Sequence, residues 1–171
     1  MSERNLEQVA LLVQHEYAHL YRMIEGLEDE LYWALCDNDP HRFPVSELLV
    51  NEGLATLAPA YVQDTDMPIS SLLFYTSEQM TCAQRREADI ARRIGESLDE
   101  PVARMDADAF SGFGDKFTAD GLPKRYGYYA GAMLIRSILE EVGWDEYPAL
   151  LRTDADTIIS ESSWLSTFGR G

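Results

Sequence analysis

The sequence predicts a mainly α-helical, single-domain fold of about six or seven helices over residues 1–171, and three observations lead to it. Apolar residues recur at steps of three and four in several segments, which is the spacing of one helix face. No segment of convincing length alternates apolar with polar residues, as a half-buried strand would. A chain of 171 residues, 46% of them apolar, is long enough to enclose one core.

The first predicted helix spans about residues 5–24. Its apolar positions follow at three- and four-residue steps: Leu6, Val9, Val13, Tyr17, Leu20 and Ile24. Leu11, Leu12 and Ala18 widen this apolar face, so we expect the helix to be buried. Gly26 is placed to end it.

Three further helices are predicted in the first 100 residues. A short one covers 28–36 and is closed by the turn residues that follow it. Ser46 is a good N-cap for the next, which runs to about residue 61. Thr76 or Ser77 can cap a longer helix that continues to about residue 98.

The remaining segments predict one loop and three helices. Residues 106–124 combine glycines with phenylalanines, so we expect a loop that folds over the rest and lines a cleft, with a plain connector as the alternative. An apolar helix over 126–142 follows, with Gly143 at its end. A short helix around 146–152 and a last one capped by Asp154 complete the chain.

The charge of the chain limits its partners. Thirty acidic residues against 14 basic ones give a formal net charge of −16, which opposes binding to nucleic acid and to anionic membrane surfaces. No run approaches the roughly 20 apolar residues of a membrane span. The first residues do not have the pattern of a signal peptide, and we therefore expect a cytoplasmic protein.

The first helix carries the most informative motif, His15-Glu16-Tyr17-Ala18-His19. Residues four apart stack on one helix face, so the two imidazoles can point at the same divalent cation. Catalytic Zn²⁺ takes such imidazole ligands and leaves one coordination position for water. Glu16 lies beside the pair, where its carboxylate can accept a proton from that water as general base.

A third ligand is needed, and Glu52 is the candidate. It follows His19 by 33 residues in an otherwise apolar helix, where a carboxylate needs a cation or a proton. Gly53 and Ala55 are small enough to let two helices approach closely. The alternative is a glutamate on the solvent side of an amphipathic helix.

Together, the HExxH motif and Glu52-Gly53-Leu54-Ala55 resemble the gluzincin metallopeptidases, and in particular a family of predicted zinc-dependent proteases first catalogued as a domain of unknown function. Residues 127–131 resemble that family's G-Y-x-x-G segment, and residues 150–162 its closing helical segment. The resemblance implies hydrolysis of a peptide or protein substrate, with zinc bound by His15, His19 and Glu52 and with Glu16 as general base.

The G-Y-x-x-G segment also suggests an oxyanion donor. A tyrosine hydroxyl near a zinc site can donate a hydrogen bond to the oxyanion that forms when a carbonyl is attacked. By its place in that segment, Tyr128 is the candidate, and a packing tyrosine is the alternative.

Zincins have a β-sheet before the active-site helix, and its edge strand pairs with the substrate. Only 14 residues precede His15 in this sequence. We therefore expect a zincin-like helical fold that lacks most or all of that sheet. The sheet is then absent, or part of a longer protein, or supplied by another subunit. If another subunit supplies it, we expect a homo-oligomer or an additional subunit.

Three functions compete with the peptidase. One is a catalytically weak or inactive zinc-binding scaffold that acts as an interaction or regulatory module. Another is a di-iron carboxylate bundle, but that site needs a second Glu-x-x-His, and the remaining histidine, His41, has Asn38 three residues before it. The last is a metal-free structural role for the HExxH helix.

Overall fold

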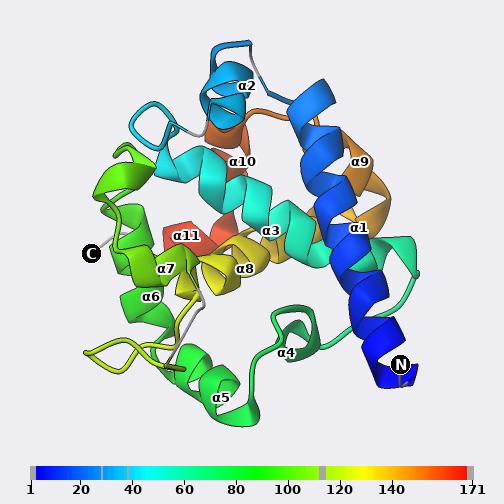
Figure 1. Cartoon of the computed structure of the whole chain (residues 1–171), viewed down its shortest axis with the longest axis vertical. Coiled ribbons are helices and arrows are strands. Elements are labelled where there is room, and N and C mark those ends of the chain that lie inside the picture. The colour runs from blue at the N-terminus through cyan, green and yellow to red at the C-terminus, as the bar shows by residue number, and fades with distance from the viewer. Residues whose placement is uncertain (1–2, 28, 38, 112–114, 169–171) are drawn as a thin grey trace.

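The computed structural model describes residues 3–27, 29–37, 39–111 and 115–168, and this part of the chain is mainly helical (Figure 1). Of its eleven α-helices, seven have seven residues or more, in agreement with the predicted six or seven. The helices are α1 (Glu3–Glu25), α2 (Asp29–Cys36), α3 (Val45–Val62), α4 (Ile69–Leu72), α5 (Ser77–Arg85), α6 (Glu87–Gly95), α7 (Ala107–Phe110), α8 (Tyr126–Val142), α9 (Tyr147–Leu150), α10 (Ala155–Glu161) and α11 (Ser163–Phe168), with 3₁₀ turns at Val102–Arg104 and Trp144–Glu146.

No strand forms among the described residues. Backbone pairing there is limited to two isolated bridges, Pro44 with Pro101 and Phe117 with Pro123. The expected fold without an N-terminal sheet is thus confirmed for this part of the chain. None of the helices that these residues form is both long and apolar enough to cross a membrane.

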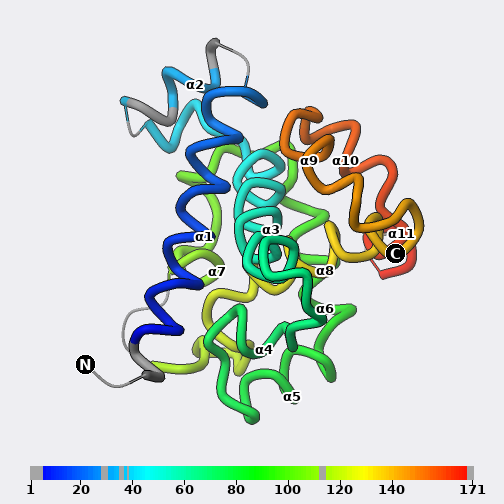
Figure 2. Tube along the Cα trace, turned by 90° about the vertical axis from the view of Figure 1, so that its right-hand side faces the viewer, coloured from blue at the N-terminus to red at the C-terminus, as the bar shows by residue number. Residues whose placement is uncertain are grey.

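Helix α3 is the centre of the fold and packs against α1 on one side and α8 on another (Figure 2). Nearly all of its residues from Val45 to Ala60 are buried, because most of its own side chains are small or apolar on every face of the helix. Gly53 meets α8 so closely that a Cβ there would lie 2.3 Å from the carbonyl oxygen of Gly131. The close approach expected of Gly53 is therefore made with α8.

Helix α1 is not buried as the sequence suggested. Figure 2 shows it along one edge of the molecule, and it packs mainly on α3. Its inner face buries Ala18 and Arg22. The outer face of α1 is apolar and 48–67% exposed at Leu6, Val9, Leu12, Val13, Tyr17, Leu20 and Ile24. The apolar spacing identified the helix, but it did not reveal that only one side of it has a partner.

Two predictions about helix ends are wrong, and tertiary contacts explain the first. Helix α3 begins at Val45 and has no side-chain cap, because the N–H groups of Val45 and Ser46 donate to the carbonyls of Glu100 and Leu98. The helix predicted over 76–98 breaks at Arg86, so that α5 and α6 are separate.

Four other boundary residues behave as predicted. Gly26 follows the end of α1, and Gly143 ends α8 with a positive φ of 101° that glycine adopts without strain. Thr76 caps α5 in a reciprocal pair with Gln79, and Asp154 caps α10.

Candidate metal centre

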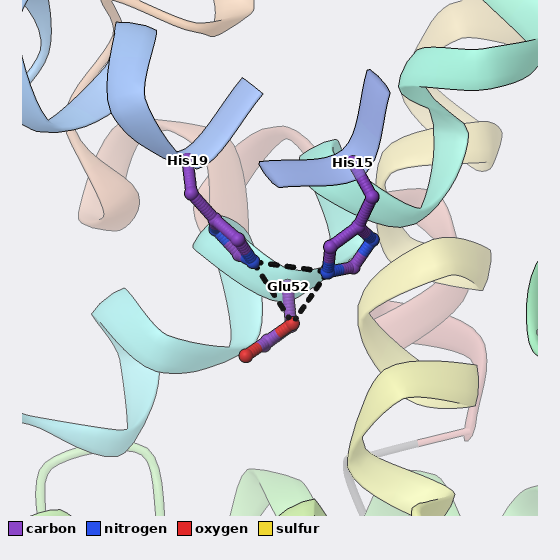
Figure 3. A group of neighbouring side chains, drawn as sticks. All are labelled: His15, His19 and Glu52. Atoms are coloured by element: carbon purple, nitrogen blue, oxygen red, sulfur yellow. Dashed lines mark hydrogen bonds and ion pairs between the residues drawn. The ribbon is translucent and has the colours of Figure 1, made fainter. Parts of the chain in front are cut away.

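Three side chains from two helices meet between α1 and α3 (Figure 3). The Nε2 atoms of His15 and His19 are 3.0 Å apart. Glu52 Oε2 lies 3.5 Å from the first and 3.3 Å from the second. The structure thus brings together all three residues that the sequence proposed as ligands.

The local sequence accounts for this convergence. His15 and His19 are one helical turn apart, so their rings lie on the inner face of α1. Glu52 lies in the central part of α3, where its side chain is only 12% exposed because α1 covers it. A carboxylate in such a place needs a charged or hydrogen-bonding partner.

The donor set fits zinc. Tetrahedral Zn²⁺ with bonds of about 2.0–2.1 Å keeps its ligand atoms about 3.3–3.4 Å apart. The three spacings here, from 3.0 to 3.5 Å, match that edge length. Glu52 Oε2 is buried and makes no hydrogen bond of good geometry with a described residue. At most one proton fits between the two facing Nε2 atoms of His15 and His19. A cation shared by both nitrogens and by Glu52 Oε2 therefore satisfies these three atoms best.

The charges of these groups are coupled. Burial alone would raise the pKa of Glu52, but N–H contacts and positive charge from His15 and His19 outweigh it and lower the pKa to about 2. Burial alone would lower the pKa of His19, whereas Glu52 and Asn51 raise it more, so that the net pKa lies above the ordinary value of 6.5. Glu52 is therefore ionised, as a metal ligand must be, at all ordinary pH values.

Asn51 holds one of the two rings, a role that the sequence did not reveal. The His19 Nδ1–H donates to Asn51 Oδ1 at 3.0 Å, which leaves His19 Nε2 free to face the centre. The signal available in the sequence was a polar residue directly before Glu52 in an otherwise apolar segment.

Glu16 does not join the cluster. It is exposed on α1, about 100° around the helix from His15, and makes no hydrogen bond or ion pair with a described residue. Its carboxylate is therefore open to solvent.

Tyr128 lies on α8, beside the metal centre. Its ring stacks on that of His15 with centroids 6.4 Å apart, and the Arg125 guanidinium lies 4.2 Å above the ring centroid. Burial and the nearby Glu52 charge raise the pKa of Tyr128 well above its ordinary value, although Arg125 opposes them. The phenol therefore stays protonated and keeps an O–H to donate.

The segment predicted as a loop over 106–124 is partly helical, because it contains α7, and the ring centroid of Phe110 in that helix lies 6.0 Å from that of Tyr128. Phe113 and its two neighbours lie outside the described residues. His41 is exposed on a loop and is not part of the cluster. Within the described ranges, the histidine–carboxylate group of α1 and α3 is the one set of three such side chains close enough to share an ion.

Comparison with known proteins gives one finding. The sequence profile of a family described as "Predicted Zn-dependent protease (DUF2268)" matches residues 1–160. No curated protein and no solved structure shows significant similarity to the chain.

Proposed function

Because the chain belongs to a family of predicted Zn-dependent proteases, we propose that it is a zinc-dependent peptidase that hydrolyses peptide bonds of a peptide or protein substrate. The observation that carries the proposal is the convergence of His15, His19 and Glu52, whose buried Oε2 makes no hydrogen bond of good geometry within the described part of the chain. These three side chains would hold the ion. A bound zinc ion would supply a water of pKa about 7 and polarise the scissile carbonyl.

Glu16 serves as the general base and acid. Its carboxylate accepts the proton of the attacking water and then passes that proton to the leaving amine. The exposed position of Glu16 beside His15 supports this role, since a base must meet both water and substrate. Tyr128 donates its O–H to the developing oxyanion, and the protonated state of its phenol supports that role.

The substrate is a peptide without a strong negative charge. The net charge of −16 repels acidic peptides at long range, and salt weakens that effect. Because the described residues form no strand, they offer no sheet edge with which a substrate backbone could pair.

Proteolysis of a labelled unfolded protein, compared between wild type and Glu16→Gln, tests the proposal. Loss of a general base should lower kcat/KM by about 10²–10⁴-fold, while the zinc content stays the same. Glu7→Gln is the matched control, because Glu7 is an exposed glutamate of the same helix.

Two outcomes contradict the proposal. Full turnover by Glu16→Gln would remove Glu16 as the base. Zinc binding without any turnover by the wild type would favour the alternative, an inactive zinc-binding scaffold.

A further inference from the structure

A buried ion pair joins the two helices that carry the metal ligands. Arg22, three residues after His19 on α1, is completely buried. Its Nη2 donates to Oε2 of Glu47 at 2.9 Å, and Glu47 lies on α3 five residues before Glu52. Neither residue belongs to the metal centre, yet each is within two helical turns of a ligand.

The same pair also binds a third segment. Arg22 Nη1 donates to the carbonyl of Thr153 at 2.9 Å, with the carbonyls of residues 150 and 151 at 3.4 and 3.5 Å. On the other side, Glu47 Oε1 accepts from the backbone N–H of Ala155 at 3.3 Å. The guanidinium and the carboxylate thus join α1, α3 and the connection from α9 to α10.

The end of α1 fits closely against this segment as well. A Cβ at Gly26 would lie 2.2 Å from the carbonyl oxygen of Leu151. The position of α1 is therefore set near its C-terminus, where Arg22 lies.

The other polar contacts that could hold the rotation of α1 lie at less buried positions. Gln63 Nε2 donates to Gln14 Oε1 at 3.0 Å and Arg152 Nη1 donates to the Tyr21 hydroxyl at 3.2 Å, both exposed to solvent. Arg22 is the side chain of α1 with no exposed surface among the described residues. Helix side chains end roughly 5–6 Å from the axis, so a rotation of about 10° moves a ring nitrogen by about 1 Å. Metal ligands tolerate deviations of only about 0.2 Å. A small rotation of α1 would therefore separate His19 from Glu52 by more than zinc accepts.

We propose that Arg22 and Glu47 are positioning residues of the metal centre, which fix the rotation of α1 against α3 and so set the spacing between His15, His19 and Glu52. This inference rests on the proposed zinc site and extends it. Arginine suits the role because its planar fork can hold a carboxylate and backbone carbonyls at the same time, which a lysine ammonium cannot do with fixed geometry.

Zinc affinity, measured by competition with a chromophoric chelator on folded protein, tests the proposal. We expect Arg22→Met and Glu47→Gln to bind zinc at least tenfold more weakly than wild type, in the range found for residues that orient metal ligands. Arg22→Lys should recover part of the affinity. Thermal unfolding of the metal-free variants reports their stability separately.

Two further variants separate positioning from stability. Ile94→Ala creates a cavity where α6 packs on α8 and α11. This variant should have a lower melting temperature, while its zinc affinity stays at the wild-type value. The double variant Arg22→Met/Glu47→Leu leaves no unpaired buried charge, so it should fold even if the single variants do not. It should still bind zinc at least tenfold more weakly.

The contradicting results are distinguishable. A wild-type chain that binds no zinc overturns the proposed function and this inference with it. If wild type binds zinc and the variants of Arg22 and Glu47 match it within twofold, the inference alone is overturned.

Discussion

Replacing Gly53 with alanine tests how much the close contact between α3 and α8 beside the metal centre contributes to stability. Gly53 directly follows Glu52 and lies against Gly131 of α8. A Cβ at residue 53 would stand 2.3 Å from the Gly131 carbonyl oxygen. Ordinary contact begins at about 3.4 Å, so the two helices would have to separate by roughly 1 Å.

Two effects of this substitution oppose each other. Alanine is favoured over glycine inside a helix by about 0.8–1.0 kcal/mol. Overpacking a tight contact costs about 1–3 kcal/mol, and occasionally more. Because the obstacle at Gly131 is backbone, we expect the high end of that cost and a net loss of about 2 kcal/mol. For a chain of this size, such a loss lowers the melting temperature by about 4–8 °C.

Thermal unfolding followed by circular dichroism measures this effect. Thr81→Ala on α5 is the control, because Thr81 is exposed and its replacement brings only the helix preference of alanine. A melting temperature of Gly53→Ala equal to or above that of wild type would refute the reasoning, since helix preference would then outweigh the contact.

Four other predictions address the centre and the edge of the molecule. Tyr128→Phe should lower kcat by at least tenfold with zinc affinity unchanged, if its O–H stabilises the oxyanion; equal loss of zinc would indicate a packing role instead. In the metal-free protein, the raised pKa of His19 stabilises the fold at low pH, and this stability is lost as the pH rises through that pKa. The lowered pKa of Glu52 stabilises the fold at higher pH, and this stability is lost as the pH falls from about 4.5 towards 2. Zinc must displace the His19 proton, so its stabilising shift in melting temperature should grow from pH 6 to pH 8, and a constant shift would contradict this. Val13→Asn should change the free energy of unfolding by less than about 0.5 kcal/mol, because Val13 is 61% exposed. A loss above about 2 kcal/mol would mean that a second copy or another subunit covers the outer face of α1.

The helices and the candidate ligands follow from local rules. The HExxH spacing places His15 and His19 on one face of whichever helix contains them. Glu52 was identified because it is a charged residue in an apolar segment, where burial without a partner is unfavourable. Both arguments need only the neighbours of a residue in the chain, and the structure brings the three side chains together.

The features that the sequence did not reveal depend on partners far away in the chain. The hydroxyl of Ser46 is not needed as a cap, because the carbonyls of Leu98 and Glu100 accept the N–H groups at the start of α3. The ion pair of Arg22 with Glu47 joins residues 25 apart. The exposure of the outer face of α1 reflects the absence of a packing partner among the described residues, which an apolar pattern cannot indicate.

X-ray absorption spectroscopy of the protein loaded with one equivalent of zinc tests the central claim most directly. We predict nitrogen and oxygen ligands at about 2.0–2.2 Å, of which two are imidazoles, with one imidazole lost in His19→Ala. No bound zinc, or a sulfur ligand at about 2.3 Å, would contradict a site built from His15, His19 and Glu52.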